Sequence, residues 1–574
     1  MPSAFGSARG RPERILPRRS EGQIGLAGTA LKSELPQVLL AGPEVPRLLA
    51  QLHPLELPRR TVEVLILGGG VAGLSAALAA SESAETLVLL KGARGETATS
   101  WAQGGMAVAW GGDDTAALHV RDTLTVASGL GHPHVTDAVV RGGPDVVQRW
   151  LEWGARFDRA DDDRLNLALE GGHSVPRIVH AGDQTGAEIQ RLLLQRSASA
   201  ARLSILESTF VLDLITDGQA VRGAVCWAPR QGFFGVWAGA TILCTGGVGQ
   251  LYRETSNPPA ATGDGLAMAY RAGAVLRGLE FVQFHPTVLY VAGMSRMLVS
   301  ETARGEGALL RDRNGHRFMP EYHPHAELAP RDVVSRSIVS QMAKVRDTHV
   351  YLDMRHLPAE RVRARFPQIH RACLEFGIDI TRDLIPVHPA CHYMVGGVMT
   401  DDDGRTSLEG LYAAGEVAST GFHGANRMGS NSLLEGAVMG HRAGLHAAGS
   451  RGTPVMRADG AGFSARSHGG DLDLQDLDNA LRALMWRLVG IERDGPGLEQ
   501  AASRLATWHH LASQRVFGDP QGWVLVNKML VGWLITRSAL SRQESRGTHY
   551  RRDYPEPDDA RWRRDLDVAR PDRL

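Results

Sequence analysis

Two histidines and two arginines form a set of side chains that could bind a dicarboxylate. They are His285, Arg331, His392 and Arg427, and they are spread over about 140 residues of the chain. A guanidinium group can donate two parallel hydrogen bonds to one carboxylate, and an imidazole adds a directed donor. We therefore expect these four side chains to converge on a site for a small dicarboxylate.

The element around which such a site would be organised is the stretch 62–80, VEVLILGGGVAGLSAALAA. It has the pattern of a buried strand, a glycine turn and a helix start. Gly68, Gly70 and Gly73 have the G-x-G-x-x-G spacing, in which the glycines permit the tight turn, the approach of a pyrophosphate and close helix packing. The alternative is a membrane span, but three consecutive glycines and Glu63 argue against it, and no other run of this length exists.

The next expected strand, Thr86–Leu90, bears on the identity of the dinucleotide. An NAD site would place an acidic residue near its end to hold the ribose hydroxyl. This chain has Lys91 there, which disfavours NAD and leaves FAD open. A hydroxyl-rich loop with Thr99, Ser100 and Gln103 follows, and it suits a phosphate or the edge of a flavin.

Two later apolar strands also end in glycines. They are TILCTGGVG at 241–249 and GLYAAGEV at 410–417, with Glu416 at the end of the second. Segments so far apart can converge on one extended ligand. The stretch between them would then be a domain inserted into the nucleotide-binding fold.

Composition narrows the class of protein. The chain has 574 residues, no formal net charge and 66 glycines, where about 7% glycine is usual. Neutral charge gives no sign of nucleic-acid binding. The four cysteines are scattered without metal-ligand or disulfide spacing, which suits a reducing compartment and predicts no metal site. We expect a soluble, cytoplasmic enzyme without a membrane span.

The two ends of the chain differ from its middle. Residues 1–60 hold eight of the 28 prolines and lack periodicity, which predicts a disordered extension, a targeting segment or an over-long start. Residues 450–470 read as a linker. Leucines at helical spacing beyond it predict a three-helix C-terminal domain over 471–550. Residues 551–574 carry mixed charge and predict a disordered tail.

Motifs along nearly the whole chain resemble the L-aspartate oxidase family, within the succinate dehydrogenase and fumarate reductase flavoprotein superfamily. They include AQGG at 102, EGGHS at 170, EFVQFHPT at 280, ETARGEGA at 301, ELAPRD at 327, PACHYMVGGV at 389 and GANRMGSNSLLE at 424. The glutamate that heads EGGHS distinguishes the oxidases. The resemblance implies an α/β fold, with a Rossmann-like FAD-binding domain at 61–278 and 394–449, an inserted α+β capping domain at 279–393 and the helical C-terminal domain.

The resemblance also implies which residues hold FAD. They come from the first glycine turn, the end of the second strand, the hydroxyl-rich loop and the later glycine strands. The expected cofactor residues are Gly68, Gly69, Gly70, Val71, Ala72, Gly73, Lys91, Ala98, Thr99, Ser100, Trp101, Ala102, Gln103, Gly104, Gly105, Val211, Asp264, Glu416, Ser432 and Leu433. Respiratory relatives carry a flavin-linked histidine where this chain has Ala98, so the FAD should be noncovalent.

The implied reaction is oxidation of L-aspartate to 2-iminosuccinate, with oxygen or fumarate as electron acceptor, as the first step of de novo NAD biosynthesis. Arg331 matches the acid/base arginine of the family and Glu170 the residue that receives the substrate ammonium. The implied substrate-binding residues are His285, His392 and Arg427, which match the family's carboxylate binders, together with Ser300 and Glu301 near them. Hand-off of the product to quinolinate synthase is a further expectation.

Two alternatives remain open at this point. One is a soluble fumarate reductase or succinate dehydrogenase flavoprotein, against which Glu170 and Ala98 argue. The other is a non-catalytic flavin-binding subunit of a larger complex, which the intact arginines and histidines disfavour. Arg331 could also act only as a charge that clamps a carboxylate, because arginine is normally always protonated.

Overall fold

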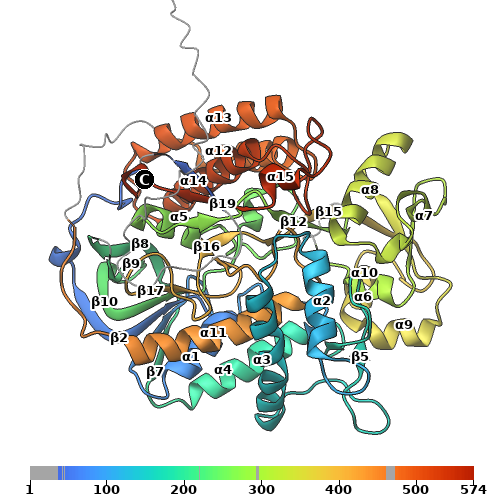
Figure 1. The fold of residues 1–574 in the computed structure, drawn as a ribbon, viewed down its shortest axis with the longest axis horizontal. Coiled ribbons are helices and arrows are strands. Elements are labelled where there is room, and N and C mark those ends of the chain that lie inside the picture. Colours follow the sequence, from blue (N-terminus) through green and yellow to red (C-terminus); the bar gives the residue numbers. More distant parts are fainter. Residues whose placement is uncertain are drawn as a thin grey trace, which may run out of the picture.

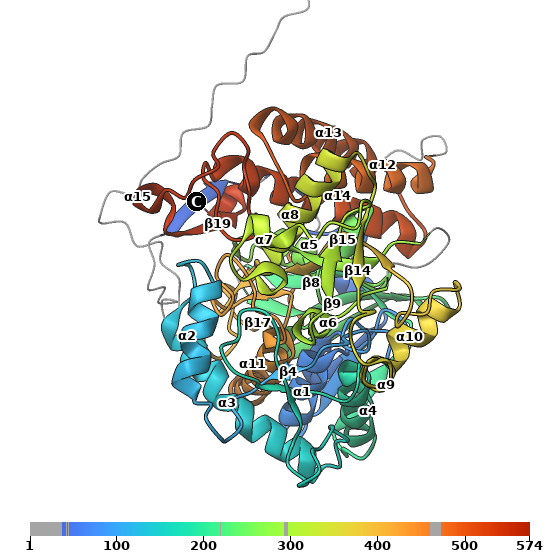
Figure 2. The same ribbon diagram turned by 90° about the vertical axis from the view of Figure 1, so that its right-hand side faces the viewer.

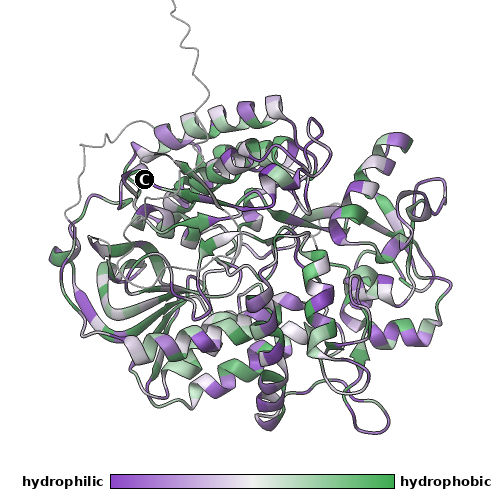
Figure 3. Cartoon of the chain, in the orientation of Figure 1, coloured by the Kyte–Doolittle hydropathy of each residue, from purple (hydrophilic) through white to green (hydrophobic). Residues whose placement is uncertain are grey.

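The computed structural model describes residues 37–41, 43, 45–218, 220–291, 297–459 and 472–573. Residues 1–36, 42 and 44 of the predicted extension and residues 460–470 of the predicted linker lie outside the described residues. Figure 1 shows an α/β architecture in which sheets occupy the centre and helices the periphery. Figure 3 shows hydrophobic residues concentrated in the central strands, with hydrophilic residues gathered on the outer helices. Within the described ranges, no helix is both long and apolar enough to cross a bilayer.

The central sheet has seven strands in the order β7-β3-β2-β10-β9-β8, with β17 paired to β10. Their bounds are β2 Arg59–Leu67, β3 Thr86–Leu89, β7 Leu203–Leu206, β8 Phe210–Asp217, β9 Ala220–Ala228, β10 Gly232–Leu243 and β17 Leu411–Ala413. The pairs β7-β3, β3-β2, β2-β10 and β10-β17 are parallel. The carboxyl ends of these parallel strands therefore meet at one edge, where α/β proteins bind ligands.

Helices cover the lower face of this sheet in Figure 1. They are α1 Val71–Ala80, α4 Thr185–Ala198 and α11 Asn431–Ser450. Gly440 and Gly444 of α11 lie directly on α1, since a Cβ at these positions would lie 2.4 and 2.3 Å from the carbonyl oxygens of Ala72 and Ala76. The two helices thus pack backbone to backbone.

A second layer of structure comes from the middle of the chain and lies on the right in Figure 1. Its sheet has the order β12-β15-β14-β13. The bounds are β12 Val282–Leu289, β13 Leu309–Arg311, β14 Val350–Asp353 and β15 Ile385–Met394. Five helices accompany it: α6 Glu301–Gly305, α7 Met319–Tyr322, α8 Arg331–Val345, α9 Ala359–Arg365 and α10 Pro367–Leu374.

Two antiparallel helices, α2 Ala116–Val126 and α3 Pro133–Glu152, and a small sheet join these layers. The small sheet consists of β4 Met106–Ala107, β5 Leu167–Ala168 and β6 Ile178–Val179. At the top lie α12 Leu474–Leu488, α13 Gly495–Ser513 and α14 Pro520–Ser541. Figure 2 shows the same three helices from the side, above α5 (Asp264–Ala272). The predicted α/β fold class with a C-terminal helical domain is confirmed.

Both predictions of disorder at the chain ends were wrong for the described residues. β1 Gln37–Ala41 pairs in parallel with β19 Asp565–Ala569, inside a five-stranded sheet ordered β1-β19-β11-β16-β18. The other strands are β11 Leu276–Arg277, β16 Gly397–Met399 and β18 Ala418–Ser419.

Two carboxylates of the predicted tail are buried and paired, whereas most of its charged side chains between 552 and 563 are exposed. Arg277 binds Asp567 at 2.8 Å and Asp565 at 3.2 Å, and His132 binds Asp565 at 3.1 Å. Leu566 between them is fully buried. Composition alone indicated solvated charge, because the partners of these carboxylates lie hundreds of residues away in the sequence.

Candidate functional site

One elongated cavity collects nearly all the residues predicted to do chemistry. Its volume is about 1860 Å³ when the space at its open mouth is included. Its walls include the residues that follow the carboxyl ends of β2, β3, β10 and β17, as expected for a ligand site in a parallel sheet. The other end of the cavity is lined from the four-stranded sheet layer, by His285, Ser300, Glu301, Arg331 and His392.

The start of α1 forms a backbone cradle at the sheet edge. Gly68 has φ +111°, and a Cβ there would lie 2.1 Å from the carbonyl oxygen of Cys244, so only glycine fits. Gly70 is the N-cap of α1 and offers no side chain to the helix, while the Val71 N–H donates to Thr99 Oγ1 at 2.9 Å. N–H groups at a bare helix start favour a bound phosphate.

Lys91 and Asp264 meet at the same end of the cavity. Lys91 Nζ lies 2.9 Å from Asp264 Oδ2, which also accepts from Thr262 at 2.6 Å, and Asn527 donates to Oδ1 at 2.8 Å. Burial opposes ionisation of Asp264, but Lys91 and these hydrogen bonds hold its pKa below the ordinary value. The pair presents one ammonium and one carboxylate to a ligand there.

Two predicted cofactor residues do not line the cavity. Gly73 lies instead against the turn that follows β2, since a Cβ there would lie 2.0 Å from the carbonyl oxygen of Gly68, so it permits the helix to pack closely. The Ser100 hydroxyl donates to the carbonyl oxygen of Gly95 at 2.5 Å and stabilises its own loop. The remaining predicted cofactor residues, and all the predicted substrate residues, line the cavity.

The polar groups around the cavity, both acceptors and donors, fit a polar cofactor such as FAD. The buried Gln103 Oε1 has no hydrogen-bond partner within the described part of the chain, although Gln103 lines the cavity. The backbone cradle of α1 provides anion-binding N–H groups nearby. Buried polar atoms are nearly always satisfied, so a bound group with a polar chain would complete them.

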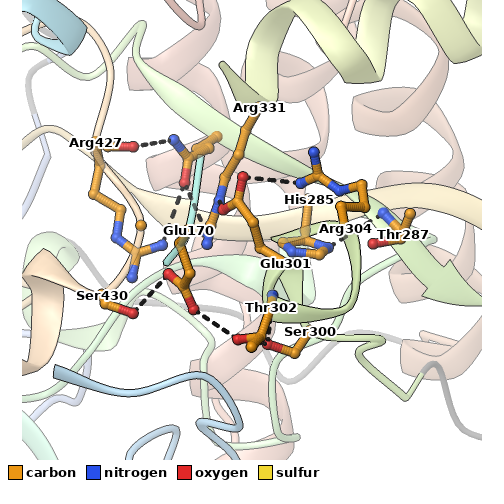
Figure 4. Close-up of polar contacts among 12 residues, drawn as sticks. Glu170, His285, Thr287, Ser300, Glu301, Thr302, Arg304, Arg331, Arg427 and Ser430 are labelled. Carbon is orange, nitrogen blue, oxygen red and sulfur yellow. Dashed lines mark hydrogen bonds and ion pairs between the residues drawn. The ribbon is translucent and has the colours of Figure 1, made fainter. Parts of the chain in front are cut away.

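Glu170 lies at the substrate end of the cavity and is held there by two hydroxyls (Figure 4). Ser430 Oγ donates to its Oε2 at 2.7 Å and Thr302 Oγ1 to its Oε1 at 3.1 Å. A Cβ at Gly104 would lie 2.6 Å from Glu170 Oε1, and one at Gly429 would lie 2.7 Å from Oε2. Glycine at these two positions leaves room for the carboxylate.

Arg331 is held beside Glu170 by a buried ion pair. Its Nε lies 2.6 Å from Glu301 Oε2, and the other oxygen of Glu301 lies 3.0 Å from Nη2 of Arg304. Burial raises the pKa of Glu301, but the two guanidinium groups outweigh burial and hold it below the ordinary value. Nη2 of Arg331 has no hydrogen-bond partner among the described residues, so it is available to a ligand.

Gln283 holds two guanidinium groups close together. Its Oε1 lies 3.4 Å from Nη1 of both Arg331 and Arg427, and its amide donates to the carbonyl oxygen of Arg427 at 2.7 Å. Arg427 also lies over the Tyr393 ring at 4.9 Å. Burial and the neighbouring charge of Arg331 lower the pKa of Arg427 to about 10, so it stays cationic at pH 7.

The two histidines contact each other edge to face, with ring centroids 5.1 Å apart. Burial and the charge of Arg331 lower the pKa of both His285 and His392 well below the ordinary value, so both are neutral at pH 7. His285 Nδ1 accepts the N–H of Thr287 at 3.2 Å, which places the proton on Nε2. Nε2 is buried without a partner among the described residues and can donate to a carboxylate.

Sequence reasoning missed several residues of this site. Gln283, Thr302, Gly429 and Ser430 lie inside the quoted motifs, so their neighbours on the chain could have indicated them. Ser256, which lies 2.9 Å from Nδ1 of His392, gave no signal in the sequence.

Glu416 supplies a prediction for the flavin-free protein. Burial raises its pKa to about 7 from an ordinary 4.5. The folded state then binds more protons than the unfolded state between these values, so stability falls as the pH rises from about 5 to 7. The shift corresponds to an upper limit of roughly 3.5 kcal/mol, and water in the cavity reduces it.

Urea unfolding at pH 5 and pH 8, for the wild type and Glu416→Gln, would measure this contribution. The variant should lose less stability than the wild type over this range, while the exposed control Glu409→Gln should behave as the wild type. Equal pH dependence in all three proteins would contradict the raised pKa.

Comparison with known proteins identifies the class of protein to which this chain belongs. Residues 63–433 match the family model described as FAD binding domain, and residues 478–570 match Fumarate reductase flavoprotein C-term. E. coli quinol fumarate reductase FrdA superposes with TM-score 0.81 at 30% identity, over 88% of this chain and 94% of that one. Mycobacterium smegmatis Sdh1 superposes with TM-score 0.78 at 34% identity, over 89% and 94%. Fold and site together define a flavoprotein of the fumarate reductase type.

Proteins of similar sequence identify the family within this class. The L-aspartate oxidase of Streptomyces coelicolor is 42% identical over 89% of this chain and 92% of its own length. That of Pseudomonas aeruginosa is 41% identical over 86% and 96%. The chain belongs to the L-aspartate oxidase family.

Proposed function

We propose that this chain binds FAD noncovalently and oxidises L-aspartate to 2-iminosuccinate, with oxygen or fumarate as the electron acceptor. The observation that carries the proposal is the Glu170 carboxylate in the same cavity as Arg331 and Arg427, where the neighbouring Glu301 is already paired with Arg331 and Arg304. Aspartate carries two carboxylates and one ammonium. Arg331 and Arg427 complement the carboxylates, and Glu170 complements the ammonium.

Bound FAD would supply the two-electron acceptor for the hydride that leaves C2 of aspartate. The N–H groups at the start of α1 would hold its pyrophosphate, and Lys91 and Asp264 would contact the adenosine side. The loop 98–105 and Ser432 with Leu433, at the start of α11, would line the flavin. Ala98 offers no nucleophile for a covalent link.

The chain's own residues orient the substrate. Arg427 and the Nε2 proton of His285 would bind one carboxylate, and His392 would contribute a further donor. Arg331 would bind the other carboxylate through its free Nη2. Ser300 is the N-cap of α6 and fixes the start of the helix that carries Glu301. These contacts would fix C2 in one orientation, which is the main contribution a protein makes to hydride transfer.

In the fumarate direction we assign Arg331 the role of proton donor. Glu301 joins it to Arg304 through two ion pairs that are buried from water. This gives the guanidinium a fixed position and a neighbouring carboxylate with which it can exchange a proton. Glu170 has no partner on fumarate, because fumarate lacks an ammonium group.

The proposal extends to organisation and cell context. We assign residues 61–278 and 394–449 to the FAD-binding domain and 279–393 to a capping domain, since β12 to β15 pair only with one another among the named strands. We further propose that the enzyme works in the cytoplasm and passes 2-iminosuccinate to quinolinate synthase.

The test is anaerobic mixing of the FAD-loaded protein with L-aspartate or with succinate, followed through the flavin absorbance. L-aspartate should bleach the flavin and fumarate or oxygen should restore it. Bleaching by succinate alone would assign the protein to the dicarboxylate dehydrogenases and overturn the proposal.

A further inference from the structure

A second cavity lies on the side of the molecule away from the carboxylate-binding residues. It is enclosed by α1, α3, α4 and α11, which lie side by side in Figures 1 and 2. Its volume is about 1380 Å³ when the space open to solvent is included. We call it the basic groove, and its principal lining residues are Glu82, Arg149, Trp150, Trp153, Arg196, Arg202 and His441.

The charge of the basic groove is unbalanced. Arg149, Arg196 and Arg202 face a single carboxylate, Glu82, in its lining. Arg149 contacts the ring nitrogens of His441 at 3.3 and 3.4 Å, and Arg202 donates to the backbone carbonyl of Glu82 at 2.9 Å. Within the described ranges, none of the three arginines has a carboxylate at ion-pair distance.

The same helices neutralise their arginines elsewhere. On α3, Arg141 binds Asp137 at 2.8 Å, and on α4, Arg191 binds Glu188 at 2.6 Å. The shortage of carboxylates is therefore a property of the groove, and not of these helices in general. Three guanidinium groups around one concave surface favour an anion, because carboxylate and phosphate accept their paired N–H groups.

The floor of the basic groove is apolar and partly aromatic. Trp150 is 2% exposed and Leu193 and Ala437 are buried. Trp153 is only partly buried, and Arg196 lies over its ring with 5.0 Å between the guanidinium carbon and the ring centroid. A flat apolar body could occupy such a surface, since aromatic rings stack both on indoles and on guanidinium planes.

We propose that the basic groove binds a small organic anion in which a carboxylate or a phosphate is joined to a flat ring. Arg149 and Arg202 bind the charged group, and Trp153 with Arg196 holds the ring. The site is separate from the FAD cavity but shares two helices with it: α1 and α11 line the FAD cavity at their first turns and the groove further along.

The test is isothermal titration of the FAD-loaded protein, with excess succinate present to occupy the dicarboxylate site. The probes are adenosine 5′-monophosphate for phosphate and phthalate for carboxylate, with adenosine and phthalamide as neutral analogues. At least one anion should bind once per chain, and its neutral analogue should not. Which anion binds distinguishes the two charged groups.

Three variants assign that binding to the groove. Arg149→Gln with Arg196→Gln should weaken binding about tenfold or more, because charged hydrogen bonds are lost. Arg202→Gln alone should weaken binding as well. This single variant keeps the proposal testable if the double variant does not fold. Arg141→Gln, an exposed arginine of α3 that does not line the groove and pairs with Asp137, should bind as the wild type. Absence of binding by both anions up to about 10 mM, or unchanged binding in the groove variants, would overturn the proposal.

Discussion

Replacing Arg331 by leucine is expected to abolish fumarate reduction while FAD remains bound. Arg331 contacts Glu301 and Gln283 and presents Nη2 to the cavity. A positioned proton donor contributes roughly 100- to 10,000-fold to a rate, so the turnover of fumarate should fall by at least that range. The measurement is steady-state fumarate reduction, with the flavin content read from the absorbance spectrum.

The buried ion pair should survive this change in part. Glu301 retains Arg304 at 3.0 Å, so its charge stays compensated and the fold should persist. Arg336→Leu is the matched control, because Arg336 lies on the same helix and pairs with Asp332 outside the cavity. A yellow Arg331→Leu protein that reduces fumarate at the wild-type rate would refute the proton-donor role.

Replacing Glu170 by glutamine is expected to weaken aspartate oxidation far more than fumarate reduction. The change removes the charge that complements the ammonium but keeps the size of the side chain. Loss of one partner of a buried charge pair costs about 2–4 kcal/mol, which corresponds to a fall of roughly 30- to 1000-fold in kcat/KM for aspartate. Fumarate carries no ammonium, so its kcat/KM should change little.

Glu170→Asp serves as the control for charge. It keeps the carboxylate, and Ser430 and Thr302 can still donate to it, so aspartate oxidation should be retained better than in the glutamine variant. Both reactions should be measured on the same preparations. An equal loss of the two reactions in Glu170→Gln would mean that Glu170 supports the site without recognising the ammonium.

The local features of the cofactor site could be predicted from the sequence. In the stretch 62–80 the strand, the glycine turn and the helix start are consecutive, and the observed β2 and α1 follow this order. Gly68 has a positive φ at the turn, and Lys91 lies two residues beyond the end of β3. Such features depend on short-range backbone geometry, so residue type and spacing were sufficient to predict them.

The tertiary structure decided which distant groups meet. Glu170 is held by Ser430, which lies 260 positions along the chain, and Arg331 is fixed by Glu301 from a different helix. No periodicity specifies these contacts, because they arise where the ends of separate elements converge. Ser100 belongs to the right loop, but only the folded turn shows that its hydroxyl faces Gly95.

The C-terminal segment likewise shows which features the sequence predicts and which depend on tertiary contacts. Polar and apolar residues alternate in DLDVA at 565–569, which is the pattern of a strand. A segment of five residues with two acids is equally typical of a solvated tail, so the sequence does not choose between them. What made this segment a strand was burial of Leu566 together with Arg277, which neutralises Asp567. The sequence alone thus determined the family, the cofactor fold and the types of side chain in the site. The tertiary structure decided which charges far apart in the chain are paired, in the active cavity and in the tail, and which are left without a carboxylate, in the basic groove. A charge is solvated, paired or buried according to what folding brings beside it.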